Sequence, residues 1–271
     1  MEQTFVDLRY ETSARVSGVV TITLDRADAR NAYSEAMVES LCAALDAAEA
    51  DPAVRCVILT GAGSAFSAGG DLKKMRDQTG MFAGGSVALR RAYIDHIQRI
   101  PRRFALFDKP IIAAINGPAI GAGLDLACMC DLRLAAAGVK LGSTFVKVGL
   151  VPGDGGAYLL ARTIGFPKAL ELMLSGRVIE AEEGLQLGLV NRVVIAEELL
   201  GAAEELAASI ARNPPLAVQL TKRAAYRAWD DGLSVALEQA ASYQGMVQRT
   251  DDHQEAVAAF LERRKPVFRG T

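Results

Sequence analysis

The fold is decided by two stretches rich in glycine and alanine. The first is Gly63-Ser64-Ala65-Phe66-Ser67-Ala68-Gly69-Gly70-Asp71-Leu72, and the second is Asn116-Gly117-Pro118-Ala119-Ile120-Gly121-Ala122-Gly123-Leu124-Asp125-Leu126. Each follows a short apolar, β-branched run, at residues 57–59 and 111–115, and each leads into a stretch that favours a helix. The pattern therefore predicts a strand, a tight turn and a helix start, twice in one chain.

Such junctions have a chemical consequence. The first N–H groups of a helix have no partner within the helix, and the helix dipole places positive charge there, so the junction attracts negative charge. Small residues let a ligand approach the backbone. Two junctions that face each other would clamp one oxygen atom, and they would stabilise it most strongly as it gains charge during a reaction. The chemistry predicted is the formation of an enolate or another oxyanion.

The rest of the first two thirds of the chain alternates strand and helix signals. Residues 16–24 alternate as a half-buried strand, and residues 35–50 carry an apolar stripe at helical spacing behind a cap at Ser34. We expect a strand at 54–60, a short helix near 70–76, a long helix over about 87–107 and a strand at 111–115. The three glycines within 77–86 fit either a flexible flap or a plain surface loop. Repeated strand–turn–helix units predict an α/β architecture.

Strand signals stop after Asn191-Arg192-Val193. Residues 196–212 have a helical pattern, Asn213-Pro214-Pro215 interrupt it, and three more helical stretches reach about Arg264. We therefore divide the chain into a core at residues 1–195 and a helical C-terminal region at residues 196–271.

Further signatures appear in order along the chain. They are Leu24-Asp25-Arg26 before Asn31-Ala32, Gly149-Leu150-Val151-Pro152-Gly153 with Gly155-Gly156, and Gly188-Leu189-Val190. Together with the two glycine-rich stretches they resemble the crotonase superfamily, the enoyl-CoA hydratase/isomerase family, over roughly residues 5 to 265. The resemblance implies a spiral of ββα units that acts on acyl-CoA thioesters. It also implies that the helical tail supports a homotrimer or a hexamer, whereas the sequence equally allows a helical cap on its own subunit.

The resemblance assigns an oxyanion hole to the backbone N–H groups of Gly70 and Ala122, where the alternative is a pair of tight turns. Losing one such donor typically costs about 3 kcal/mol of transition-state stabilisation. Asp125 follows Ala122 by three residues, on the same helical face, and matches an acidic residue that is a glutamate in related hydratases. Its side chain is one methylene shorter, and a displacement of about 1 Å can cost on the order of 100-fold in rate.

The second hydratase glutamate falls at Phe145, which can neither activate water nor move a proton. Phe145 is instead a candidate for the wall of the acyl pocket, or for ordinary core. Asp154, in the Gly153 to Gly156 loop, is the compensating candidate, because apolar packing there would raise its pKa. Either aspartate also suits a purely structural role at a helix start. The two acids together favour proton shuttling through an enolate and leave hydration in doubt.

For coenzyme A, which we expect only as part of the substrate and not as a cofactor, the resemblance indicates two groups of contacts. They are Arg26, Ala29 and Arg30 after the first strand, and Ala68, Asp71, Leu72 and Lys73 beside the clamp. The arginines would meet phosphates, although exposed arginines are often only solvated. Phe260 and Lys265 lie where relatives contact the coenzyme A of their own or a neighbouring subunit.

Composition argues against several other classes of protein. The 271 residues are 51% hydrophobic with a net charge of −2, which predicts a globular protein without a basic field for nucleic acid. No apolar segment is long enough to span a bilayer and the first residues do not resemble a secretion signal, so we expect a cytoplasmic protein without a membrane partner. The four cysteines lack metal or redox spacing and are expected as buried thiols, and we expect no metal.

Two rival interpretations remain open. A dinucleotide-dependent oxidoreductase would use Gly121-Ala122-Gly123, but the next glycine that such a motif needs is Leu126. A scaffold or RNA-interacting protein would keep the fold and lose the activity. Other reactions of the same superfamily, namely acyl-CoA hydrolysis, dehalogenation and decarboxylation, would use the same oxyanion hole.

Overall fold

The computed structural model describes residues 5–271 and contains two sheets. The large sheet has the order β1-β2-β3-β4-β6-β9, with β1 (Leu8–Thr12) antiparallel to β2 and every later pair parallel. Its other strands are β2 (Val19–Leu24), β3 (Cys56–Gly61), β4 (Ile111–Ile115), β6 (Leu132–Ala136) and β9 (Arg192–Val194). The small sheet has the order β5-β7-β8, from β5 (Ala119–Ile120), β7 (Lys140–Gly142) and β8 (Ile179–Glu180). The predicted α/β spiral is confirmed.

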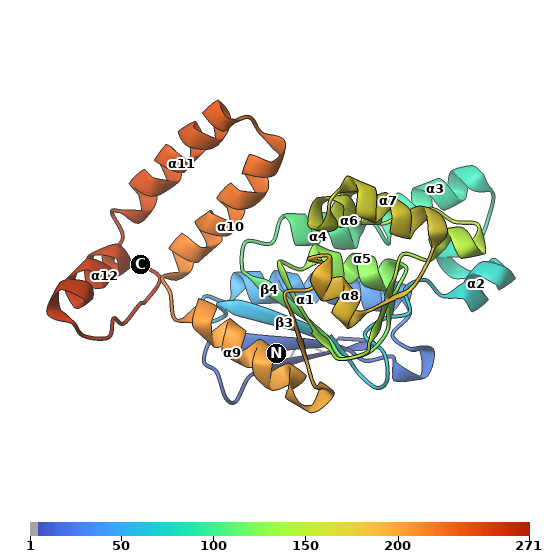
Figure 1. Ribbon diagram of the computed structural model, residues 1–271, viewed down its shortest axis with the longest axis horizontal. Helices are drawn as coiled ribbons and strands as arrows, with labels where there is room; N and C mark the ends of the chain where they lie inside the picture. Colours follow the sequence, from blue (N-terminus) through green and yellow to red (C-terminus); the bar gives the residue numbers. More distant parts are fainter. Residues whose placement is uncertain (1–4) are drawn as a thin grey trace.

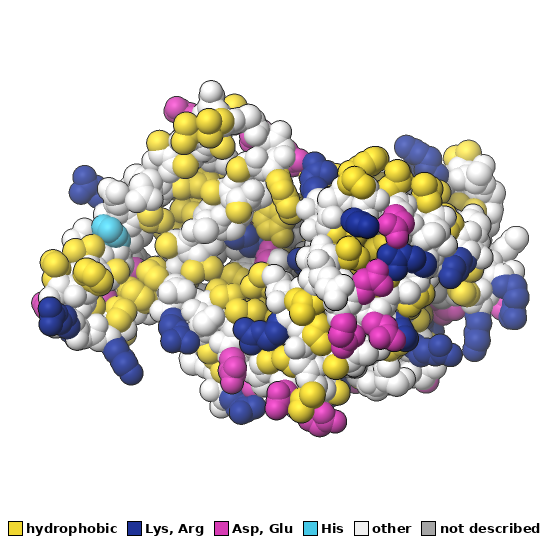
Figure 2. All heavy atoms as spheres, viewed as in Figure 1, with side chains coloured by type: hydrophobic (Ala, Val, Ile, Leu, Met, Phe, Trp, Pro, Cys, Tyr) yellow, Lys and Arg dark blue, Asp and Glu magenta, His cyan; other side chains and the backbone are white. Residues whose placement is uncertain are grey.

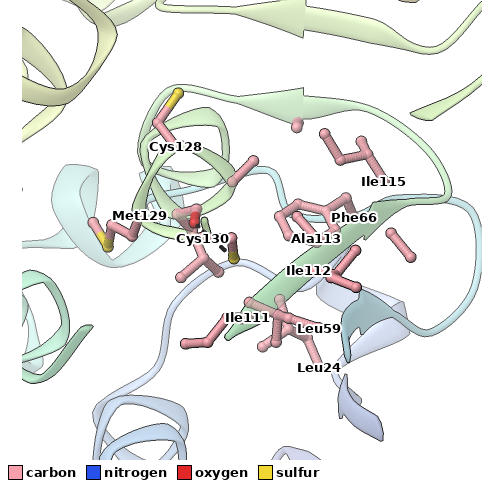
Figure 3. Packing of buried hydrophobic residues seen from close by; sticks show 14 of the residues in the cluster. Leu24, Leu59, Phe66, Ile111, Ile112, Ala113, Ile115, Cys128, Met129 and Cys130 are labelled. Carbon is pink, nitrogen blue, oxygen red and sulfur yellow. Dashed lines mark hydrogen bonds between the residues drawn. The ribbon is translucent and has the colours of Figure 1, made fainter. Parts of the chain in front are cut away.

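The centre of the large sheet is buried on both faces. Every residue of β3 and β4 is buried, as expected for parallel strands that are covered by helices on both sides. Helix α1 (Glu35–Ala50) packs against β1 and β2, and α9 (Leu199–Ala211) packs against β2, β3, β4 and β6. Around β4, buried side chains such as Leu59 and Ile112 cluster with those at the end of α5 (Ala122–Met129) (Figure 3).

Several expected elements begin and end close to their predicted bounds. The helix predicted at 35–50 is α1, and the Ser34 hydroxyl caps it by accepting a hydrogen bond from the Met37 amide at 2.9 Å. The short helix expected near 70–76 is α2 (Leu72–Asp77). All four cysteines are buried free thiols, as expected.

The single long helix expected over 87–107 is wrong. The structure has α3 (Ser86–Asp95) and α4 (Arg99–Ala105), with His96 outside helical geometry at φ −118° and ψ −89°. Pro101 gives the reason, because a continuous helix would need an N–H at position 101 to bond the carbonyl of Ile97, and proline has none. In α4 the proline lies in the first turn, where no such bond is needed.

The segment at 77–86 is anchored at its centre. A short 3₁₀ turn, η2 (Gly80–Phe82), buries Met81 and Phe82, and the Glu35 carboxylate accepts a hydrogen bond from the Met81 amide at 2.9 Å. The residues on both sides of this buried pair, 77–80 and 83–86, are exposed. The structure therefore shows a loop that is fastened to α1 through its middle.

The second half of the core consists of short elements. After β7 come η3 (Phe145–Val148), α6 (Gly156–Ile164), α7 (Phe166–Ser175) and α8 (Ala181–Gln186). Helix α6 packs against α5 and α7. The turns η1 (Ala27–Ala29) and η4 (Ala196–Glu198) follow β2 and β9.

The last three helices project away from the body of the molecule (Figure 1). They are α10 (Pro215–Asp230), α11 (Leu233–Val247) and α12 (Asp251–Glu262), which confirms three helical stretches after the Asn213-Pro214-Pro215 break. Lys222 on α10 bonds Asp131 at 2.8 Å and so ties the base of this tail to the core. The division at residue 195 stays a prediction, but α9 itself contributes Leu199, Ala203 and Ala207 to the core.

Candidate active site

The two glycine-rich segments lie side by side. Ser67 pairs with Ala119 in a parallel bridge, the Ser67 amide donates to the Pro118 carbonyl at 3.2 Å, and the Ile120 amide donates to the Ser67 carbonyl at 3.0 Å. Gly69 has φ +81°, and a Cβ there would lie 2.8 Å from the Ala122 nitrogen. Glycine is required at this position for both reasons, and the close approach brings the starts of α2 and α5 together.

Gly70 and Ala122 both lie at these two helix starts, Gly70 two residues before α2 begins and Ala122 at the first position of α5. Ala122 is the first residue of α5, while Gly70 precedes Asp71, whose carboxylate caps α2 by accepting from the Lys73 and Lys74 amides at 3.2 Å each. Within the part of the chain that the structure describes, neither the Gly70 nor the Ala122 amide donates to a protein acceptor. Both N–H groups are thus available at adjacent positive helix ends.

Asp125 and Asp154 form a buried pair. Asp125 is 0% exposed on α5, Asp154 is 2% exposed in the loop before α6, and none of their four carboxyl oxygens has a hydrogen-bond partner among the described residues. Burial, together with the neighbouring Asp154 carboxyl, raises the pKa of Asp125 well above its usual range. Burial also raises the pKa of Asp154. Such a pair holds a proton that isolated carboxyl groups would lose, and it titrates as a unit.

A glycine makes room for this pair. A Cβ on Gly156, the first residue of α6, would lie 2.2 Å from both carboxyl oxygens of Asp125. The Asp125 carboxyl therefore packs directly on the start of α6. This contact explains, at the level of packing, why the Gly155-Gly156 pair follows Asp154.

Tyr93 and Gln98 contact the loop that carries Asp154. The Tyr93 ring on α3 packs against Gly153, where a Cβ would lie 3.0 Å from it, and the pKa of Tyr93 is raised by burial and then by the charge of Asp154. Gln98 donates from Nε2 to the Gly153 carbonyl at 2.9 Å. The region between α2 and α4 thus forms one wall of the site.

Phe145 forms another part of the wall. It is half-buried at the start of η3, and a Cβ on Gly121 would lie 3.8 Å from its ring. Its apolar side chain is therefore adjacent to the start of α5. Among the predicted site residues, the structure brings Gly70, Ala122, Asp125 and Asp154 together with Phe145.

The residues expected near coenzyme A fall into two groups. Arg26 bonds Asp71 at 3.3 Å and the Ala32 carbonyl at 3.0 Å, and the Ala68 amide donates to the Arg30 carbonyl at 2.9 Å, so residues 26–30 lie along residues 68–73. Arg26 and Asp71 thus bind each other, while Arg30, Leu72 and Lys73 are exposed and Ala29 is half-buried in η1. Within one chain, Phe260 and Lys265 are not part of this cluster, because Phe260 lies on α12 and Lys265 follows that helix, which belongs to the projecting tail (Figure 1).

Sequence reasoning missed three residues of the site. Tyr33 is buried, donates from its hydroxyl to the Ala122 carbonyl at 3.1 Å, and has its pKa raised by burial and then by Asp154 and Asp125. Its one sequence signal is its place directly after Asn31-Ala32. Tyr93 and Gln98 carried no signal, because they lie in a helical pattern far along the chain from Asp154.

Residues 5–271 lack two further features. No group of three or more His, Cys, Asp or Glu side chains is arranged to hold a metal ion in that range. None of its helices combines the length and the apolar character that crossing a membrane requires.

Comparisons with known proteins agree on one family. The family described as Enoyl-CoA hydratase/isomerase matches residues 14–271. A 1,2-epoxyphenylacetyl-CoA isomerase from Escherichia coli K12 is 37% identical over 254 residues, which covers 93% of this chain and 95% of the relative. A 2,3-dehydroadipyl-CoA hydratase from the same organism is 34% identical over 257 residues, covering 95% and 97%.

The solved structures agree. An enoyl-CoA hydratase from Bacillus anthracis superposes with a TM-score of 0.91 at 35% identity and covers 98% of this chain and 100% of that one. An enoyl-CoA hydratase from Mycobacterium smegmatis superposes with a TM-score of 0.89 at 32% identity, covering 97% and 98%. The chain therefore belongs to the enoyl-CoA hydratase/isomerase family.

Proposed function

We propose that this chain moves protons on the acyl group of a coenzyme A thioester, with Asp125 and Asp154 as the acid–base pair and the amides of Gly70 and Ala122 as the oxyanion hole. The family membership supports an acyl-CoA-processing enzyme. The observation that carries the finer proposal is the buried aspartate pair, whose oxygens lack partners among residues 5–271 and which lies beside the start of α5.

The oxyanion hole would act on the thioester carbonyl. Two fixed N–H groups stabilise negative charge on that oxygen, and so they lower the free energy of the enolate that forms when a carbon acid loses its proton. The environment is prearranged, because both donors are fixed at helix starts. Replacing either contact typically costs a factor of about 100 or more in rate.

The aspartate pair would then carry the proton. A pair that holds one proton contains both a base and an acid, so one carboxylate takes the proton from carbon while the other carboxyl group delivers one to a different carbon. In a double-bond shift, one C–H bond breaks, the double bond moves through the enolate, and another C–H bond forms. No water is consumed and no net proton is released.

Isomerisation is favoured over hydration by the residue at position 145. Hydration needs a group that activates water, and the half-buried Phe145 ring offers an apolar surface at the position where related hydratases carry a second glutamate. Hydration remains the second candidate, since a hydratase stands beside an isomerase among the similar proteins. It would require both aspartates to hold the water.

Isotope exchange separates these possibilities. We would incubate the enzyme with saturated, unsaturated and aromatic acyl-CoAs in deuterated water and follow deuterium on carbon by mass spectrometry. The proposal predicts that the wild-type enzyme exchanges the α-proton and forms a product with a shifted double bond. It predicts that Asp125→Asn and Asp154→Asn lose this exchange. A hydroxyacyl product would favour hydration. Unchanged exchange in both variants would refute the assignment of the acids, and tight binding without exchange would favour a scaffold.

We also propose that the tail assembles the chain into a homotrimer or hexamer. Helix α11 buries none of its side chains, and Leu233, Phe260 and Leu261 are at least 74% exposed. Apolar side chains are visible along the tail in Figure 2. A second copy of the chain is the occupant that would cover them, and it would bring Phe260 and Lys265 to a neighbouring coenzyme A site. Sedimentation of wild type as a monomer at micromolar concentration would contradict this assembly.

A further inference from the structure

We propose that Tyr33 is a positioning residue that ties the two halves of the oxyanion hole together, one through its backbone amide and the other through its hydroxyl. The inference rests on the function proposed above for Gly70 and Ala122. Tyr33 follows β2 and precedes the Ser34 cap of α1, so it belongs to neither glycine-rich segment.

The backbone of Tyr33 holds the first donor. Its amide donates to the Gly69 carbonyl at 2.8 Å. That carbonyl and the Gly70 N–H belong to one planar peptide unit and point in opposite directions, because the peptide is trans. Fixing the oxygen of this unit therefore fixes the direction in which the Gly70 N–H points.

The side chain of Tyr33 holds the second segment. Its hydroxyl donates to the carbonyl of Ala122 at 3.1 Å, and both residues are about 5% exposed or less. The bond anchors the first residue of α5, whose N–H is the other proposed donor. A single residue thus contacts both segments beside the atoms that would hold the thioester oxygen.

The segment that carries Tyr33 is itself firmly attached. Ser67 donates from its hydroxyl to the Asn31 carbonyl at 2.8 Å, and the Ala68 amide donates to the Arg30 carbonyl at 2.9 Å. Residues 30–33 therefore run along the first glycine-rich segment as a brace. From this brace the tyrosine ring extends to α5, and its length sets how far the two helix starts lie apart.

Mutation can test the side chain of Tyr33 separately from its backbone amide. Tyr33→Phe keeps the backbone amide, the ring and its packing, and removes only the hydroxyl. We expect α5 to lose its anchor at Ala122 while the Gly70 amide stays held. The matched control is Tyr226→Phe, which removes from α10 a tyrosine hydroxyl that donates to Asp131 at 2.9 Å.

The test combines infrared spectroscopy with kinetics. A saturated acyl-CoA labelled with ¹³C at the thioester carbonyl would report how strongly the hole polarises that bond, through the downshift of its stretching frequency on binding. We expect a clear downshift in wild type and Tyr226→Phe and a smaller one in Tyr33→Phe. The latter should lose about tenfold in kcat, equivalent to about 1.4 kcal/mol, with KM within about twofold of wild type.

The outcomes are separable. A full downshift with wild-type kcat in Tyr33→Phe would overturn the role of Tyr33 and leave the oxyanion hole standing. A wild type without any downshift would overturn the hole, and the role of Tyr33 with it. If Tyr33→Phe does not fold, 3,5-difluorotyrosine at position 33 keeps the ring and offers a more acidic hydroxyl. A downshift at least as large as in wild type is then expected, and a smaller one would contradict the proposal.

Discussion

Replacing Gly156 by alanine tests the placement of Asp125 with one methyl group. Gly156 is the first residue of α6, its φ is not positive, and the start of a helix accepts alanine readily. The new Cβ would lie 2.2 Å from both carboxyl oxygens of Asp125, a distance below the 3.0 Å that Cβ atoms keep from other heavy atoms. Replacing glycine by alanine stabilises the helical backbone, so any loss of stability or activity must come from the displaced Asp125 carboxyl group.

The size of the effect follows from that distance. The Asp125 oxygens must move by roughly 1 Å, and a misplacement of that size costs on the order of 100-fold in rate when the group takes part in the reaction. Overpacking of a buried site also costs about 1–3 kcal/mol of folding stability. We therefore expect Gly156→Ala to fold, to melt at a lower temperature, and to lose about 100-fold in proton exchange.

Gly201→Ala is the matched control. Gly201 lies within α9, its φ is not positive either, and a Cβ there meets nothing within 4 Å. We expect this variant to keep full activity and to gain about 0.5–1 kcal/mol of stability from helix propensity. Deuterium exchange and thermal melting, measured on both variants, decide the matter. Wild-type exchange in Gly156→Ala would refute the reasoning, because a displaced Asp125 could not then be the acid or base.

Three further predictions concern stability and accessibility. Burial raises the pKa of Asp125 well above its ordinary 3.8, so the native state binds protons that the unfolded state has released, and stability should fall as the pH rises above about 4. Asp125→Asn should reduce this pH dependence of the free energy of unfolding, measured by urea unfolding at several pH values. The same pH dependence in the variant and in wild type would contradict the prediction. Burial raises the pKa of Cys56 and Cys128 to about 12, so a thiol reagent near neutral pH should label neither until the protein is unfolded, and rapid labelling of the native protein would be evidence against this burial. Asp71→Ala removes the cap of α2 and should lower the free energy of unfolding by about 1 kcal/mol, measured by chemical denaturation. The control is Asp77→Ala, at an exposed position of the same helix. If Asp71→Ala lowers the free energy of unfolding no more than this control does, the cap contributes little.

Local patterns were enough to predict the elements that surround the site. The helix at 35–50 and its Ser34 cap follow from spacing and side-chain chemistry within a few residues, and both are confirmed. The strand before each glycine-rich stretch and the helix after it were predicted in the same way. The long helix over 87–107 failed because apolar periodicity outweighed Pro101, whose missing N–H breaks the helix near His96.

The arrangement of the site depends on contacts that span the sequence. Tyr33 meets Ala122 across 89 positions, and Gly156 meets Asp125 although β6, β7 and η3 lie between them in the chain. No periodicity encodes such pairs, because each arises from the way the ββα units stack. Pairing of the two aspartates and apolar packing around Asp154 could be proposed from the sequence, but the complete burial of Asp125 could not, since an aspartate in the first turn of a helix is ordinarily exposed.

The most direct test of the account is a crystal structure of the protein with a slowly reacting acyl-CoA bound. The account predicts that the thioester oxygen lies about 3 Å from both the Gly70 and the Ala122 nitrogens, with the acyl carbons next to the Asp125 and Asp154 carboxyl groups. A thioester oxygen that contacts neither amide, or only one of them, would contradict it.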